Sequence, residues 1–299
     1  MSKIYDALNR AEMERGETVE TIAQRFASVR VTKSPLPFPD PMESESEIVD
    51  PPLDLSLISR VPWLPSLDRL PALLERGKAL EQFRSLRSHL REFRDLGELK
   101  TVLVTSGLPQ EGKSFVSANL AISLARHKAS KVLLIDGDMR RSSLPKLLGC
   151  QAAPGLTDYL SGNSNLTDIM QRGKAADGEE LPGGLNSLFF IPAGSDADNA
   201  ADLSGSPRFA RLLAACAPSF DWIIVDSSPV NLVSDGVNLG RQCDGTLIVA
   251  RGGVTEFSTA QRAISELRAV KTLGFVLNAA ADSHDTGSYY GYDANPKTI

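Results

Sequence analysis

Residues 101–114 read Thr-Val-Leu-Val-Thr-Ser-Gly-Leu-Pro-Gln-Glu-Gly-Lys-Ser, and the fold prediction begins with this stretch. Its first five residues form a near-continuous apolar run, which is typical of a strand buried on both faces in a parallel sheet. Gly107 to Ser114 then fit the pattern GxxxxGK[ST] without a gap, and a helical pattern follows over 115–125. A strand, a glycine-rich loop and a helix in this order favour phosphate binding over a chance glycine-rich turn. The stretch therefore predicts a nucleotide site at the end of a buried strand.

The ligands expected at this loop are ATP and Mg²⁺. Backbone N–H groups would surround the β-phosphate, and the N-terminus of the following helix would add a partial positive charge. Lys113 would neutralise the β- and γ-phosphates, and the Ser114 hydroxyl would ligate Mg²⁺. The residues expected to contact the nucleotide here are Gly107, Gln110, Glu111, Gly112, Lys113, Ser114 and Phe115.

Apolar runs recur after this first strand. They lie at residues 132–135, 189–191, 222–225, 246–249 and 274–277, and helical patterns separate most of them, notably at 115–125 and 259–270. Strands that alternate with helices indicate βαβ units. The fold class predicted is α/β, a three-layer P-loop nucleotide-hydrolase fold with a mainly parallel sheet flanked by helices.

Acidic residues follow two of these predicted strands. Asp136 and Asp138 come after the run 132–135, and Asp226 comes after the run 222–225. Ligands of open α/β sheets bind at the carboxyl ends of the strands, so all three carboxylates are expected to face the loop. Asp226 is expected to hold Mg²⁺, and Asp136 and Asp138 to support the metal or act as a general base. An aspartate in such a place also serves as a turn former or a helix cap, and that alternative stays open.

The chain divides into three parts by composition. Residues 1–75 form an N-terminal extension and linker, residues 76–281 the predicted catalytic domain, and residues 282–299 a polar tail that contains Tyr289, Tyr290 and Tyr292. Between residues 34 and 71 there are nine prolines, with acidic residues among them. Proline removes backbone donors and like charges extend a chain, so this linker and the tail are expected to be disordered.

The bulk composition bounds the classes of partner. The net charge of −5 argues against a nucleic-acid-binding surface. Three widely separated cysteines indicate reduced thiols in a cytoplasmic protein. Met1 is followed by polar residues rather than an apolar signal segment, and no apolar run is long enough to span a membrane. If the protein works at a membrane, another chain must recruit it.

Three motifs in this chain resemble those of bacterial tyrosine kinases. The loop Gly107 to Ser114 looks like their Walker A motif, Leu-Leu-Ile-Asp136-Gly-Asp138-Met-Arg140 like Walker A′, and Trp-Ile-Ile-Val-Asp226 like Walker B. These kinases belong to the deviant-Walker ATPases, which include MinD and ParA. Shorter segments agree, since Glu81-Gln-Phe-Arg84-Ser-Leu-Arg87 resembles the ExxRxxR helix of the family, and Val-Leu-Asn278 resembles the segment whose Asn contacts adenine.

This resemblance implies an ATP-dependent tyrosine autokinase that regulates exopolysaccharide or capsule synthesis or export. The family assigns the general base to Asp136, the metal to Ser114, Asp138 and Asp226, and charge compensation at the phosphoryl group to Lys113 and Arg140. The phosphate acceptors implied are Tyr289, Tyr290 and Tyr292 of a neighbouring subunit. Glu81, Arg84 and Arg87 would assemble a ring-like homo-oligomer. The further partner implied is a membrane chain-length or co-polymerase protein that recruits the kinase to the inner face of the membrane.

Two other functions remain open at this point. A MinD- or ParA-like ATPase switch would carry an extra lysine just after the first residue of the loop, where this chain has Leu108, and this difference favours the kinase. A non-enzymatic ATP-binding scaffold is the second alternative. Some positions also depart from the family pattern, among them Phe115 and the segment Ser227-Ser228-Pro229.

Overall fold

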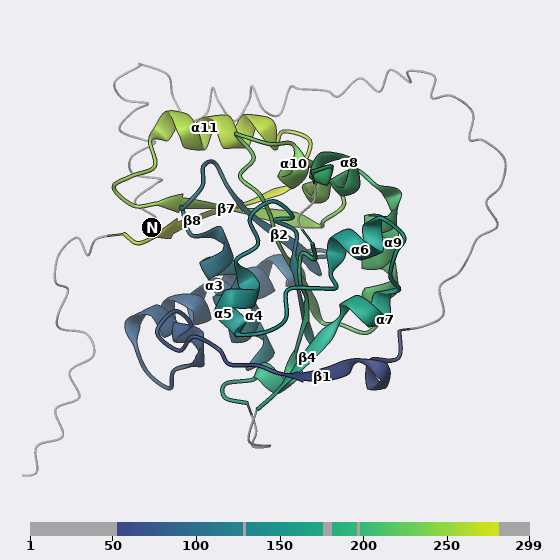
Figure 1. Cartoon of the computed structure of the whole chain (residues 1–299). Coiled ribbons are helices and arrows are strands. Elements are labelled where there is room, and N and C mark those ends of the chain that lie inside the picture. Colours follow the sequence, from purple (N-terminus) through teal and green to yellow (C-terminus); the bar gives the residue numbers. More distant parts are fainter. Residues whose placement is uncertain (1–52, 128–129, 176–180, 196–197, 281–299) are drawn as a thin grey trace, which may run out of the picture. The chain divides into compact units, whose positions relative to one another are not determined.

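The computed structural model describes residues 53–127, 130–175, 181–195 and 198–280. An eight-stranded sheet lies at the centre of this part of the chain, in the order β1-β4-β5-β3-β6-β2-β7-β8 (Figure 1). Its strands are β1 (Ser59–Pro62), β2 (Thr101–Ser106), β3 (Val132–Asp136), β4 (Gln171–Lys174), β5 (Leu188–Ile191), β6 (Trp222–Asp226), β7 (Gly245–Arg251) and β8 (Thr272–Asn278). All neighbouring strands are parallel except β4 and β5. The predicted α/β class with a mainly parallel sheet is confirmed, and each of the six apolar runs lies in a strand.

Helices cover both faces of the sheet (Figure 1). The longer ones are α3 (Lys78–Asp95), α4 (Lys113–Ala125), α9 (Pro207–Cys216) and α11 (Phe257–Glu266). The shorter ones are α5 (Leu144–Leu148), α6 (Leu156–Leu160), α7 (Leu166–Ile169), α8 (Ala200–Ser204) and α10 (Asp235–Gly240), with the 3-10 turns η1 (Leu55–Leu57), η2 (Pro71–Leu73) and η3 (Leu185–Ser187). No helix of the described residues is long and apolar enough to cross a membrane.

The central strands are apolar because both of their faces are covered. Every residue of β2, β3 and β6 is buried. Successive side chains of a strand point to opposite faces, so Val102 and Val104 pack in the core beneath α3 and α4, whereas Leu103 packs in the core beneath α6 and α9. This burial explains why these strands appear in the sequence as continuous apolar runs rather than as alternating patterns.

Helix α3 joins the sheet through α4. Leu80, Phe83 and Leu90 of α3 are buried at the helical spacing that the sequence predicts. The Phe83 ring packs against the ring of Phe115 on α4, with 5.8 Å between the centroids. Helix α4 is buried over nearly its whole length. It follows that α3 and α4 form one layer, and that the predicted phosphate-binding loop leads into a helix that is enclosed along its length.

The segment before α3 corrects one expectation. Residues 53–71 fall within the linker predicted to be disordered, yet β1 pairs with β4 and Trp63 is only 2% exposed. The Trp63 ring packs edge-on against Phe190 at 6.4 Å between centroids, and its Nε1 donates to Gln171 Oε1 at 3.3 Å. The prolines are compatible with this structure because β1 is an edge strand and Pro62 is its last residue. The expectation of disorder is wrong for this segment, and the predictions for residues 1–52 and 282–299 fall outside the described residues.

The packing of Trp63 leads to a stability prediction. Trp63→Ala should lower the free energy of unfolding by about 3–5 kcal/mol, because a large aromatic side chain leaves a cavity in the core. The neighbouring Leu64 is 79% exposed, so Leu64→Ala is a matched control that should change the free energy of unfolding by less than about 0.5 kcal/mol. Chemical denaturation of both variants provides the measurement. If Trp63→Ala lowered the free energy of unfolding by as little as the control, the segment before α3 would not contribute to the core.

Candidate nucleotide site

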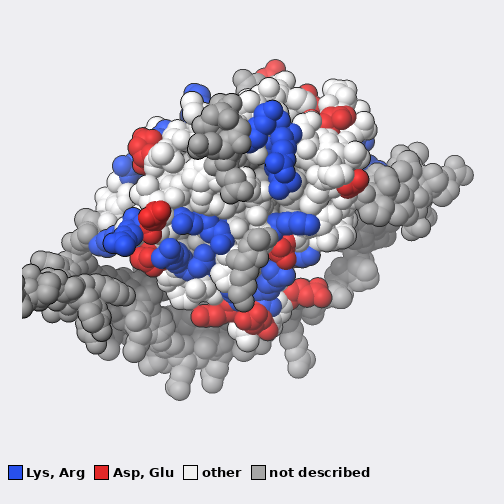
Figure 2. Space-filling model, turned by 90° about the horizontal axis from the view of Figure 1, so that it is seen from below, with Lys and Arg blue, Asp and Glu red and all other residues white. Residues whose placement is uncertain are grey.

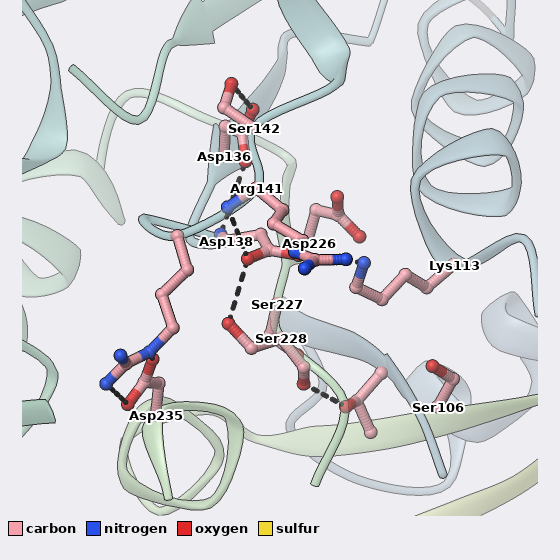
Figure 3. Close-up of polar contacts among 12 residues, drawn as sticks. Ser106, Lys113, Asp136, Asp138, Arg141, Ser142, Asp226, Ser227, Ser228 and Asp235 are labelled. Carbon is pink, nitrogen blue, oxygen red and sulfur yellow. Dashed lines mark hydrogen bonds and ion pairs between the residues drawn. The ribbon is translucent and has the colours of Figure 1, made fainter. Parts of the chain in front are cut away.

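The predicted site residues meet at the carboxyl ends of three adjacent strands. The phosphate-binding loop follows β2, Asp136 ends β3 and Asp226 ends β6, and the sheet order places β6 between β3 and β2. Asp136 and Asp226 are register partners across β3 and β6. Figure 3 shows Lys113 from α4 reaching toward the same cluster of carboxylates. Residues more than a hundred positions apart thus form one site.

Backbone conformation shapes the loop before α4. Gly112 has φ +96° and Gln110 has φ +65°, both in the left-handed region. For Gly112 there is a second requirement, since a Cβ atom there would lie 2.0 Å from Asn278 Nδ2. Gln110 lacks the conformational freedom of glycine. Its left-handed backbone conformation is uncommon for a residue with a side chain. Strained backbone is held only where the surroundings determine it, so the contacts around this loop are part of the site.

Glu111 holds the loop through both its side chain and its backbone. The residue is 3% exposed, and its carboxylate accepts hydrogen bonds from Leu108 N at 2.7 Å and from the Thr255 hydroxyl. Asn278 Nδ2, at the end of β8, donates to the Glu111 carbonyl at 3.0 Å. The Glu111 side chain therefore turns toward the protein, which leaves its backbone N–H as the group that could face a phosphate. Thr255 was missed by the sequence analysis because nothing local connects it to the loop, and the predicted contact of Asn278 with adenine stays a prediction.

Lys113 and Asp138 form a nearly buried ion pair. Lys113 Nζ lies 2.8 Å from Asp138 Oδ2, and the other oxygen of Asp138 accepts hydrogen bonds from Ser228 Oγ at 3.0 Å and Arg141 N at 3.1 Å (Figure 3). Burial alone would lower the pKa of Lys113, but the charges of Asp226 and Asp138 outweigh it and raise this pKa. Lys113 is therefore protonated at neutral pH, and the site holds a permanent cation next to its carboxylates.

Asp136 is fully buried at the end of β3. Its Oδ2 accepts a hydrogen bond from Ser142 Oγ at 2.7 Å, and its Oδ1 accepts one from Asp138 N at 3.2 Å. Burial, with the nearby charge of Asp226 as the second cause, raises the pKa of the Asp136 carboxyl to about 8. A carboxyl whose pKa lies near neutrality has the proton affinity expected of a general base. The base role that the resemblance implies stays a prediction.

Asp226 provides the test of a metal site. Its Oδ1 accepts a hydrogen bond from Ser117 Oγ at 3.0 Å, while its buried Oδ2 has no hydrogen-bond partner among the described residues. Burial raises the pKa of Asp226 to about 6, although Lys113 opposes the rise. No group of three or more His, Cys, Asp or Glu side chains in the described ranges could hold a metal ion alone. Mg²⁺ typically uses one or two carboxylates and completes its shell with phosphate oxygens and waters, so the residues fit this ion. Asp226, Ser114 and Asp138 would hold it.

Arg140 lies in a different environment from the one expected. Its Nε and Nη2 donate to the two carboxylate oxygens of Asp235 on α10, at 2.7 and 3.3 Å. Asp235 is fully buried, and its hydrogen bond raises the pKa of Arg140. A buried carboxylate needs such a partner, so this pair fixes the turn after β3 against α10. The predicted role of Arg140 at the phosphoryl group stays a prediction.

The residues predicted for assembly lie on α3, away from the ends of β3 and β6. Arg84 pairs with Glu81 at 2.5 Å, and both side chains are well exposed. Arg87 is partly buried and donates to the Ser123 carbonyl on α4 at 2.8 Å. Arg84 and Arg87, together with Arg126, line a cavity of about 530 Å³, and Figure 2 shows Lys and Arg side chains gathered on the face seen from below. Glu81 and Arg84 can meet another molecule, whereas Arg87 also supports the packing of α3. The predicted acceptors Tyr289, Tyr290 and Tyr292 lie outside the described residues.

Comparison with known proteins identifies relatives of this chain. No protein-family profile matches it. The tyrosine-protein kinase ptk of Acinetobacter johnsonii is 30% identical over 249 residues, which cover 78% of this chain and 32% of that protein. The tyrosine-protein kinase YwqD of Bacillus subtilis is 32% identical over 219 residues, which cover 72% of this chain and 87% of that protein. Among solved structures, the kinase domain of Escherichia coli tyrosine kinase ETK has a TM-score of 0.66 and 28% identity, over 80% of this chain and 89% of that domain.

The extent of these matches differs between relatives. The chain spans about a third of the length of ptk but most of the length of YwqD. The similarity therefore concerns the domain that ptk, YwqD and the ETK kinase domain have in common. With this sequence identity, this coverage and the shared fold, the chain belongs to the bacterial tyrosine-protein kinase family.

Proposed function

We propose that this protein is an ATP-dependent protein-tyrosine autokinase. The observation that carries the proposal is the buried pair Asp136 and Asp226, side by side at the ends of β3 and β6 and next to Lys113 of the phosphate-binding loop. Membership in the tyrosine-protein kinase family supports the same reaction. The extra lysine expected of a MinD-like switch is replaced by Leu108, so no specific observation favours that alternative.

The loop residues bind and orient ATP. Backbone N–H groups at the start of α4 and the Lys113 ammonium surround the β- and γ-phosphates. A bound Mg²⁺, held by Asp226, Ser114 and Asp138, would supply positive charge that favours the ionised form of the neighbouring carboxyls and neutralises the phosphate oxygens. Lys113 now contacts Asp138, so it would exchange this carboxylate for phosphate as the nucleotide enters.

Asp136 would accept the proton of the attacking tyrosine. The tyrosine oxygen forms a bond to the γ-phosphorus, the bond from this phosphorus to the oxygen bridging the β- and γ-phosphates breaks, and ADP leaves with those electrons. A tyrosine hydroxyl has a pKa near 10, so a base that takes its proton is needed at neutral pH. The hydrogen bond from Ser142 to Asp136 Oδ2 fixes the orientation of this base.

The acceptors proposed are Tyr289, Tyr290 and Tyr292 of a neighbouring subunit in a ring-like homo-oligomer. Glu81, Arg84 and Arg87 on α3 would form the contact between subunits. A membrane chain-length or co-polymerase protein would recruit the kinase to the inner face of the membrane, where phosphorylation regulates exopolysaccharide or capsule synthesis or export. Incubation with labelled ATP, followed by phosphotyrosine detection and a phosphate-release assay, separates the kinase from an ATPase switch and from a scaffold.

The first prediction from the proposed function concerns Asp136. Asp136→Asn should leave nucleotide binding nearly intact and lower transfer to tyrosine by orders of magnitude, since the amide cannot accept the proton. The control Asp68→Asn changes an exposed carboxyl and should transfer phosphate at the wild-type rate. Initial rates of phosphotyrosine formation provide the measurement. A wild-type rate for Asp136→Asn would show that another group is the base.

The stability of the same variant relative to the wild type should increase with pH. The pKa of Asp136 is about 8 in the folded protein, above its ordinary value of 3.8, so the native state holds a proton that the unfolded state has lost. The wild type therefore loses stability as the pH rises from about 4 to 8. In buffer without Mg²⁺ or nucleotide, Asp136→Asn should gain thermal stability relative to the wild type between pH 5 and pH 8.5. A constant difference in Tm across this range would contradict the raised pKa.

The second prediction concerns assembly. Changing Glu81 and Arg84 together to Ala should reduce self-association measured by light scattering, because both side chains are exposed and complementary charges would bridge subunits. Adding Arg87→Ala should also lower Tm, since Arg87 holds the Ser123 carbonyl. The exposed pair Arg262 and Glu266 on α11 is a matched control, and its removal should leave the mass unchanged. If the wild type associates and the Glu81 and Arg84 variant has the same mass, these residues are simply solvated.

The third prediction concerns the acceptor tyrosines. Mass spectrometry after incubation with ATP and Mg²⁺ should find phosphate on Tyr289, Tyr290 and Tyr292, and a variant with all three changed to Phe should lose the label. Each phosphate adds about −1.5 to −2 charges at pH 7, so labelling should also weaken self-association. Tyr159 is 7% exposed and is not accessible in the folded domain. Tyr5→Phe is the control, and full labelling of the triple variant would contradict the assignment.

A further inference from the structure

Two adjacent arginines, Arg140 and Arg141, lie in the turn after β3, and their side chains point in different directions. The Arg140 guanidinium donates two hydrogen bonds to the Asp235 carboxylate. Figure 3 shows the Arg141 side chain extending from the turn at Asp138 toward the side on which Lys113 and Asp226 lie. Within the described ranges, the Arg141 guanidinium has no hydrogen bond or ion pair, although its backbone N–H is bonded. In this turn the Arg140 guanidinium is therefore bonded to Asp235, whereas the Arg141 guanidinium could bind a ligand.

The position of Arg141 is determined by the site itself. Its backbone N–H donates to Asp138 Oδ1 at 3.1 Å, and the other oxygen of Asp138 is 2.8 Å from Lys113 Nζ. The base of the side chain is thus one carboxylate away from the phosphate-binding lysine. The side chain is exposed, so it can reach a ligand without leaving a buried partner.

The charges of the site call for a second cation. Asp136, Asp138 and Asp226 are buried together, and the ion pair within this cluster of described residues joins Lys113 to Asp138. ATP brings several further negative charges, and charge spreads over the γ-phosphoryl oxygens during transfer. A guanidinium matches these oxygens better than an ammonium, because its planar fork can donate two parallel hydrogen bonds.

We propose that Arg141 is the residue whose guanidinium contacts the γ-phosphate of ATP, and that Arg140 is a positioning residue that holds the turn through Asp235. This inference rests on the proposed function and deepens it. As the tyrosine oxygen bonds to the γ-phosphorus and the bond to ADP breaks, Arg141 stays protonated and stabilises the non-bridging oxygens. The tyrosine proton goes to Asp136, so the arginine neither gives nor takes a proton. Arg141 thereby takes the role that the resemblance gives to Arg140.

Nucleotide affinity is the direct test, because ADP lacks the γ-phosphate. Calorimetric titration of the full chain with Mg²⁺, using ADP and a non-hydrolysable ATP analogue, would measure both affinities. Arg141→Ala should weaken binding of the analogue about tenfold and leave that of ADP within about twofold, as expected for loss of a charged hydrogen bond to the γ-phosphate. Arg141→Lys keeps the charge but not the fork, and should lie between. Arg211→Ala, an exposed arginine on α9, is the control and should change neither affinity.

Two further measurements separate Arg141 from Arg140. Arg141→Ala should slow phosphotyrosine formation by about 10²- to 10³-fold without lowering Tm. Arg140→Ala should lower Tm, because Asp235 loses its partner in a buried position, and should keep the preference for the ATP analogue over ADP. An unchanged preference in Arg141→Ala, or a loss of preference in Arg140→Ala at normal Tm, would overturn the inference. A wild type that binds the analogue but forms no phosphotyrosine would refute the kinase proposal instead, and the affinities would still decide the contact of Arg141.

Discussion

The burial of negative charge at the ends of β3 and β6 is the constraint on which the site depends. Asp136 and Asp226 are register partners with no exposed surface, and Asp138 lies two residues further along the chain. Water cannot stabilise these charges, so the pKa of Asp136 rises to about 8 and that of Asp226 to about 6. Lys113 offsets part of the cost of burying these charges, and hydrogen bonds from the serine hydroxyls offset a further part. A site of this kind gains most from ligands that bring cations, because positive charge favours the ionised form of buried carboxyls.

The fold places these carboxylates at some cost in stability. Burying carboxylates costs free energy, and a sign of this cost is the buried Oδ2 of Asp226, which has no hydrogen-bond partner in the described part of the chain. The left-handed Gln110 adds backbone strain in the adjacent loop. Both features are tolerated because the central strands are buried on both faces and α4 is enclosed along its length. The rigid layers thus support a site whose local structure is unfavourable before a ligand arrives.

Contacts between distant segments hold the loop and its surroundings. Glu111 binds Thr255 from the loop after β7, while Asn278 from β8 binds the Glu111 carbonyl and excludes any side chain at Gly112. On the other side, Asp235 of α10 holds Arg140 and leaves Arg141 available. Helix α3 shows the same division of tasks, because Arg87 secures α4 while Glu81 and Arg84 remain exposed. Within one motif, some residues therefore secure the packing of the fold while their neighbours remain exposed.

Local sequence was enough to predict the parallel sheet and to place the loop 107–114 and the three aspartates at the same edge of it. Strands buried on both faces appear as apolar runs, and strand ends in an open α/β sheet mark the ligand site, so short stretches carry this information. Residues 59–62 and 171–174 gave no such signal, because β1 and β4 are short and polar and become strands only by pairing with each other and with β5. The contact of Thr255 with Glu111 and that of Asp235 with Arg140 join side chains that meet only in the folded structure. A motif specifies the order of residues along the chain, whereas the direction of each side chain is decided by the partners that the tertiary structure brings to it.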